Sequence, residues 1–147
     1  VIHLFCLGVT LNDPKKKNIG KAMMMLIFWI VPVLSWLSNL SIYGYALGMN
    51  VDVDMIICIL MGGMFILLGN YMSKNHQNYT VGIKLPWTLN SEENWNRTHR
   101  MAGKLWILAG FVFWGSIFFK NNLLPLVIIA VVVVPMGYSF LLYKKGI

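Results

Sequence analysis

The sequence has few charged residues, and few of those are acidic. Of its 147 residues only 12% are charged, with five Asp and Glu against twelve Lys and Arg, while 58% are hydrophobic. A soluble domain carries about 25% charged residues, and a chain this short cannot bury so much apolar surface. The hydrophobic content also excludes an intrinsically disordered chain. The composition therefore predicts a membrane protein with several spans.

Cysteine and histidine are scarce as well. Cys6 and Cys58 both lie in apolar runs and form no C-x-x-C pair, so we interpret them as small apolar side chains. The spacing from His76 to His99 matches no pattern of metal ligands. We therefore expect neither a metal site nor a cofactor.

Four long apolar runs can each cross a membrane. In lipid a lone strand would leave its backbone unpaired, so each run is expected to be a helix. A fifth run, at residues 1–11, is shorter than the about 20 residues that a span needs, and we interpret it as the end of a helix whose beginning is missing. The predicted fold is all-α: a single membrane domain over residues 1–147, a polytopic helical bundle of four full transmembrane helices plus an N-terminal partial one. The full spans are predicted at about 22–47, 55–71, 102–119 and 123–143.

The basic residues alternate between successive connections. Those at 12–21, 48–54, 73–104, near residue 120 and after residue 143 hold four, zero, five, one and two Lys or Arg. Because basic connections stay inside, loops 12–21 and 73–104 and the C-terminus are predicted to be cytoplasmic. The bases are divided among membrane-flanking loops and form no continuous basic face, so direct nucleic-acid binding is not expected.

The 73–104 connection is the one segment of polar character. Asn90 or Ser91 can cap a helix that we expect to continue through Trp95 and His99 into the third full span. One interpretation is a cytoplasmic juxtamembrane helix, with tryptophans at the headgroups of the lipid bilayer and bases at anionic lipid. The other is a specific docking or catalytic surface.

Three stretches of this segment closely resemble the signature of the SdpI family. They are Gly82-Ile83-Lys84-Leu85-Pro86-Trp87-Thr88-Leu89, Ser91-Glu92-Glu93-Asn94-Trp95 and Thr98-His99-Arg100-Met101-Ala102-Gly103. The family is named for bacterial membrane proteins that give immunity to a secreted killing peptide. The resemblance covers about residues 12–143. Because the family usually has six spans, it implies that this chain lacks the N-terminal span and part of the second.

The resemblance implies a non-enzymatic, multi-pass protein of the bacterial cell membrane that protects against a secreted peptide toxin. The family is also linked to signal transduction, in which a cytosolic transcriptional repressor is held at the membrane. Carried onto this chain, the outer ends of the spans would meet the toxin, and the cytoplasmic segment would receive any soluble partner. The predicted partner or signature surface consists of Gly82, Pro86, Trp87, Thr88, Glu92, Glu93, Trp95, Thr98, His99, Arg100 and Gly103.

An intramembrane hydrolase is the alternative from a different class. The residues Glu92-Glu93-Asn94-Trp95-Asn96-Arg97 fit the E-E-x-x-x-R pattern of the CAAX-type proteases, where a glutamate pair could activate water with a histidine such as His99 completing the site. That family needs further histidines in later helices, and no histidine follows His99. Glu93 and Arg97 also have the spacing of an ion pair along a helix.

A small transporter is a third possibility, but the long runs contain no acid, and Lys104 lies at the edge of its run. Ser35, Asn39 and Tyr43 form an intramembrane polar stripe in the first run. Such a stripe favours interhelical hydrogen bonds, or it could line a groove that receives an amphipathic toxin. Five glycines are expected to permit close helix contacts: Gly62, Gly63, Gly69, Gly103 and Gly110.

Overall fold

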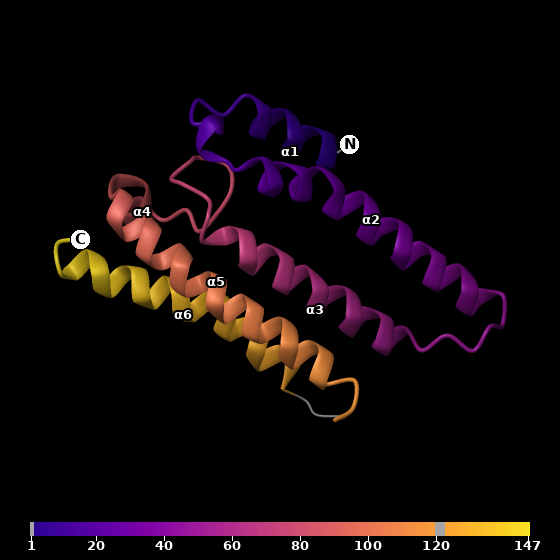
Figure 1. Cartoon of the computed structure of the whole chain (residues 1–147). Helices are drawn as coiled ribbons and strands as arrows, with labels where there is room; N and C mark the ends of the chain where they lie inside the picture. Colours follow the sequence, from indigo (N-terminus) through magenta and orange to yellow (C-terminus); the bar gives the residue numbers. More distant parts are fainter. Residues whose placement is uncertain (1, 120–122) are drawn as a thin grey trace.

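The computed structural model describes residues 2–119 and 123–147, and within them all regular structure is helical (Figure 1). This confirms the all-α prediction. The connection at 120–122 contains one basic residue, Lys120, and lies outside the described residues. The elements are α1 (Ile2–Leu11), the single 3-10 turn η1 (Lys16–Asn18), α2 (Lys21–Ala46), α3 (Val53–Met72), α4 (Pro86–Asn90), α5 (Glu92–Gly115) and α6 (Leu124–Lys144).

Three of the described helices, α2, α3 and α6, are long and apolar enough to cross a membrane. The predicted count of four full spans is not confirmed. The run at 102–119 forms the second half of α5, which begins at Glu92 and ends at Gly115. Helix α5 therefore carries acids and bases in its first half and apolar residues in its second.

Helices α3 and α5 lie side by side along most of their length and approach at paired glycines. A Cβ atom built on Gly69 would lie 2.7 Å from the Gly103 carbonyl oxygen, and one on Gly103 would lie 2.6 Å from the Gly69 oxygen. Gly62 and Gly110 meet in the same way, at 2.9 and 2.6 Å. The prediction of close contact is confirmed at these four positions. It is wrong at Gly63, where a Cβ would meet nothing within 4 Å.

Helix α6 packs on α5 (Figure 1). Phe65 of α3, Ala109 and Phe113 of α5, and Val131 of α6 form one buried cluster. The Trp106 indole N–H donates to the Val131 carbonyl at 3.1 Å, which fixes the register of α5 against α6. These three helices make up the core of the protein.

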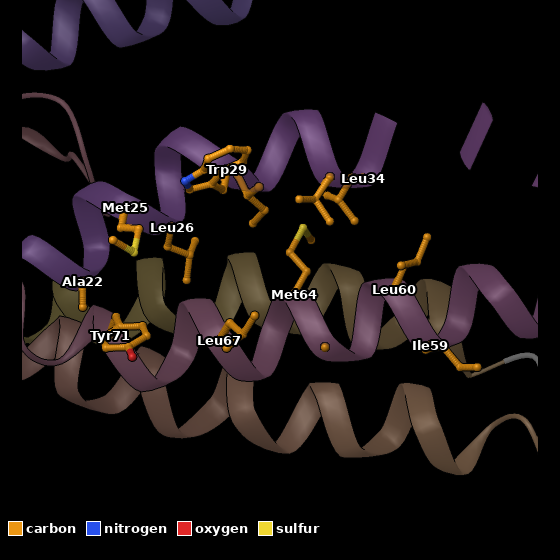
Figure 2. Close-up of a pocket in the computed structure, with 13 residues that line it drawn as sticks. Ala22, Met25, Leu26, Trp29, Leu34, Ile59, Leu60, Met64, Leu67 and Tyr71 are labelled. Carbon is orange, nitrogen blue, oxygen red and sulfur yellow. The ribbon is translucent and has the colours of Figure 1, made fainter. Parts of the chain in front are cut away.

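Helix α2 lies to one side of this core and packs against it through α3. Most of its side chains are exposed, as expected for a helix surrounded by lipid. A groove of about 490 Å³ separates it from α3. Figure 2 shows that the groove is lined by apolar side chains of both helices, among them Trp29, Leu34, Met64 and Leu67.

Candidate functional site

The segment between α3 and α5 is folded by hydrogen bonds from its own side chains. Asn78 is fully buried. Its Oδ1 accepts from the backbone N–H groups of Thr80 at 3.1 Å and Val81 at 2.7 Å, and its Nδ2 donates to the His76 carbonyl at 2.8 Å. A short amide side chain of this kind can replace the hydrogen bonds of regular structure. The irregular chain is therefore fixed in one conformation.

Asp13 joins the first loop to this segment. Its Oδ2 accepts from the Tyr79 backbone N–H at 3.0 Å and from the Thr80 hydroxyl at 2.8 Å, and its Oδ1 accepts from the Lys15 N–H at 2.7 Å. Burial raises the pKa of Asp13, but the hydrogen bonds from Thr80, Lys15 and Tyr79 outweigh it and hold the pKa below its ordinary value. The carboxylate is therefore ionised at neutral pH and tethers the two loops.

Gln77 provides a second tether between the same loops. Its Oε1 accepts from Lys15 Nζ at 2.9 Å, and its backbone oxygen accepts from Asn18 Nδ2 at 2.7 Å. Its Nε2 donates to the carbonyls of Thr88 and Leu89, at 2.9 and 2.8 Å. Gln77 therefore connects the first loop with the end of α4.

Trp95 and His99 form the centre of the segment. Their side chains are 0% and 1% exposed, and the rings stack with centroids 3.9 Å apart. The Trp95 indole N–H donates to the Asn75 carbonyl at 2.9 Å. The backbone of Gly82 lies against the edges of both rings with φ +133°, and a Cβ there would lie 2.4 Å from His99 Nε2. Only glycine fits at this position, because it has no Cβ and readily adopts positive φ.

Both ring nitrogens of His99 are hydrogen-bonded. The Ile83 backbone N–H donates to Nε2 at 2.9 Å, so Nε2 is unprotonated, and Nδ1–H must then donate to the Trp95 carbonyl at 2.8 Å. Burial lowers the pKa of His99 to about 4, although the bond to the Trp95 carbonyl acts in the opposite direction. His99 is therefore neutral at neutral pH, and its two nitrogens hold backbone in place.

This burial predicts a pH-dependent stability. Between a folded-state pKa of about 4 and the ordinary value of 6.5, the unfolded chain binds a proton that the folded chain does not. The stability that His99 provides is complete above pH 6.5 and is lost as the pH falls towards 4. We expect a decrease of about 3 kcal/mol in the free energy of unfolding across this window, measured by thermal unfolding in detergent.

The matched control is His76→Gln, which changes an exposed histidine of the same segment. It should retain the pH dependence, whereas His99→Gln should be less stable at neutral pH and should lose the dependence between pH 5 and 6.5. The stability that Asp13 provides through its lowered pKa is lost only as the pH falls below the ordinary value of 3.8, which lies outside that window. An unchanged dependence in His99→Gln would refute the assignment.

A second buried network joins α4, α5 and α6. The Trp87 indole N–H donates to Ser139 Oγ at 2.8 Å, and Ser139 Oγ donates to Asn94 Oδ1 at 2.7 Å. Thr98 Oγ1 donates to the same oxygen at 3.1 Å, and Asn94 Nδ2 donates to the Ser139 carbonyl at 3.1 Å. Sequence reasoning missed Ser139, although a single serine in an apolar run indicates a buried polar contact.

Serine and threonine side chains begin the two helices of the segment. Thr88 Oγ1 accepts from the Leu85 N–H at 2.8 Å at the start of α4, where Pro86 occupies the first turn. Ser91 Oγ accepts from the Asn94 N–H at 3.1 Å at the start of α5. The prediction of a helix that runs from a cap at Asn90 or Ser91 past Trp95 and His99 into the apolar run is confirmed, with Ser91 as the cap.

The comparisons with known proteins match this part of the chain. The family model described as the SdpI/YfhL protein family matches residues 74–139. The chain is also 31% identical over 149 residues to the "Immunity protein SdpI" of Bacillus subtilis (strain 168), and this match covers 99% of the chain and 72% of the relative. The chain belongs to the SdpI family. No solved structure matches it.

The matched range of the SdpI family contains both buried networks, from Asn75 to Ser139. Of the residues predicted as a signature surface, five are buried and offer no surface to a partner: Thr88, Trp95, Thr98, His99 and Gly103. Gly82 and Trp87 are partly buried against the same rings and hydroxyls. The exposed members are Pro86, Glu92, Glu93 and Arg100. The signature thus specifies chiefly how the segment folds.

The three residues of the hydrolase alternative do not come together. Glu93 forms the ion pair with Arg97 expected from their spacing, at 2.6 Å. Glu92 and Glu93 are exposed, whereas His99 is buried and bonded through both nitrogens to backbone. Within residues 2–119 and 123–147, no three His, Cys, Asp or Glu side chains are grouped to hold a metal. The SdpI family is not an enzyme family.

The polar stripe on α2 is exposed. Asn39 Nδ2 donates to the Ser35 carbonyl at 2.7 Å and approaches its hydroxyl at 3.4 Å, so both side chains bond along their own helix. The interhelical hydrogen bonds that the stripe favours are not formed by Ser35 or Asn39 in the described part of the chain. Tyr43 continues the stripe towards the end of α2 and is also exposed.

Proposed function

We propose that this chain is an integral membrane immunity protein that protects a bacterial cell from a secreted antimicrobial peptide. The observation that carries the proposal is the 31% identity to the Bacillus subtilis immunity protein SdpI, over 99% of the chain. The three apolar helices α2, α3 and α6 support a place in the cell membrane. Protection here requires binding rather than hydrolysis.

The proposed orientation keeps loops 12–21 and 73–104 and the C-terminus in the cytoplasm. The positive-inside rule supports this, since these segments hold most of the bases. The tethers at Asp13 and Gln77 support it independently, because loops that hydrogen-bond to one another must lie on the same side of the membrane. The acidic connection with Asp52 and Asp54 then faces outward, where the toxin arrives.

The two partners would use different parts of the protein. The toxin would meet the exposed side of α2, where the stripe of Ser35, Asn39 and Tyr43 interrupts an apolar surface. A cytosolic repressor would meet the exposed remainder of the signature surface. That remainder is Pro86, Glu92, Glu93 and Arg100.

A toxin challenge of sensitive cells that make the chain tests the proposal. Glu92→Gln and Glu93→Gln should leave protection largely unchanged, because neither carboxylate contacts His99. In a hydrolase, loss of an essential acid or base would reduce activity by about 10²–10⁴-fold. Complete loss of protection in both variants, at normal membrane levels, would favour the hydrolase instead.

The orientation is checked in the same cells with a membrane-impermeant thiol reagent, in a Cys6→Ala, Cys58→Ala background. The reagent should label an Asn50→Cys variant from outside and should leave a Lys16→Cys variant unlabelled until the cells are opened. The reverse labelling would contradict the proposed orientation.

A further inference from the structure

A basic hollow lies between α5 and α6. It has a volume of about 350 Å³ and is lined by Arg97, Arg100, Met101, Lys104 and Tyr138. The three bases follow one another at spacings of three and four, so they share one face of α5. Neither the family match nor the proposed immunity function assigns a ligand to this hollow.

The charge of the hollow is only partly compensated. Glu93 binds Arg97 at 2.6 Å at its outer edge. Among the residues that the structure describes, neither Arg100 nor Lys104 has a carboxylate within 4.0 Å. Two uncompensated cations and a tyrosine hydroxyl fit an anion with several oxygens, and a guanidinium is especially suited to phosphate because it can donate two parallel hydrogen bonds.

The surroundings of the hollow are apolar. On α5 the same face continues from Lys104 to Leu108 and Phe111, both exposed. On α6 Val134 and Leu141 lie one turn to either side of Tyr138, and both are exposed. Because α6 is long and apolar enough to span the membrane, these side chains meet lipid. The hollow therefore lies where a helix face changes from charged to apolar.

We propose that this hollow binds the phosphate of an anionic phospholipid, with Arg100 and Lys104 as its main ligands and the acyl chains along Leu108 and Phe111. A soluble anion would use the bases alone, whereas a phospholipid uses both the bases and the apolar face beside them. Basic pockets between membrane helices on the cytoplasmic side are suited to anionic headgroups. The proposal depends on membrane insertion and not on the immunity function.

Native mass spectrometry of the purified full chain tests the site. The detergent-solubilised protein is titrated with phosphatidylglycerol or with phosphatidylcholine, and the bound lipid is counted. We expect a preference for phosphatidylglycerol, and the double variant Arg100→Gln/Lys104→Gln should weaken its binding by about 30-fold. The matched control is Lys16→Gln/Lys17→Gln, which removes the same charge from the first cytoplasmic loop and should bind as the wild type does.

Three results would overturn the proposal. Equal binding of the two lipids by the wild-type chain would remove the headgroup preference. Equal weakening in both double variants would show general attraction by positive charge. Displacement of phosphatidylglycerol by inorganic phosphate would identify a site for the free anion. All four substituted side chains are at least partly exposed and none is in the buried networks, so unchanged melting temperatures are expected.

Discussion

Gly82→Ala should destabilise the protein by about 3 kcal/mol, because two costs add at this position. The backbone has φ +133°, which disfavours any side chain, and the new Cβ would lie 2.4 Å from His99 Nε2 and 2.9 Å from Trp95. The two rings cannot retreat, since both are buried and hydrogen-bonded. Thermal unfolding in detergent, followed by tryptophan fluorescence, measures the loss.

Gly137→Ala is the matched control, because a Cβ at this position of α6 meets nothing within 4 Å. It should be neutral or slightly stabilising, since alanine is preferred to glycine inside a helix by about 0.5–1 kcal/mol. Similar melting temperatures for the two variants would show that Gly82 does not approach the rings as closely as described.

Gly69→Ala should separate α3 from α5. The added Cβ would lie 2.7 Å from the Gly103 carbonyl oxygen and 2.9 Å from the Ile107 nitrogen. Both are backbone atoms of α5, so relief requires a shift of the whole helix rather than a rotation of one side chain. Such overpacking costs about 1–3 kcal/mol, which should appear as a lower melting temperature and as looser packing around Phe65 and Phe113.

Gly63→Ala provides the comparison within the same helix. Its Cβ would meet nothing within 4 Å, so the variant should unfold at or above the wild-type temperature. If Gly63→Ala and Gly69→Ala behave alike, the α3–α5 contact does not depend on the paired glycines.

Local and compositional features of the fold were predictable from the sequence. The apolar runs predicted helices, Ser91 predicted the start of α5, and the spacing of Glu93 and Arg97 predicted their ion pair. Four of the five glycines expected at close helix contacts are found there. Each of these inferences depends on residues within a few turns of one another, or on a property that holds wherever helices pack in lipid.

Long-range contacts were not predictable in this way. The spacing of Trp95 and His99 shows that they share a face, but it does not show whether that face meets lipid, a partner or the protein itself. The answer depends on Gly82 and Asn75, which reach the rings from elsewhere in the segment. Trp95 and His99, which the sequence places in a predicted docking surface, therefore form the buried centre of the segment.

The connection between the two cytoplasmic loops was hidden for the same reason. Asp13 and Thr80 are 67 residues apart in the sequence, and no local rule pairs them. The number of spans is not confirmed, since hydropathy locates an apolar run without showing where its helix begins. The cap at Ser91 decides that α5 is one helix with a polar and an apolar half.

The dose of peptide toxin that kills sensitive cells tests the central claim most directly. Cells that make the wild-type chain should survive a higher dose of the cognate secreted peptide than cells with an empty vector. Cells that make Gly82→Ala should lose this advantage in proportion to the folded protein left in their membranes. Identical killing curves for the wild-type chain and the empty vector, with the chain present and folded in the membrane, would contradict the proposed immunity function.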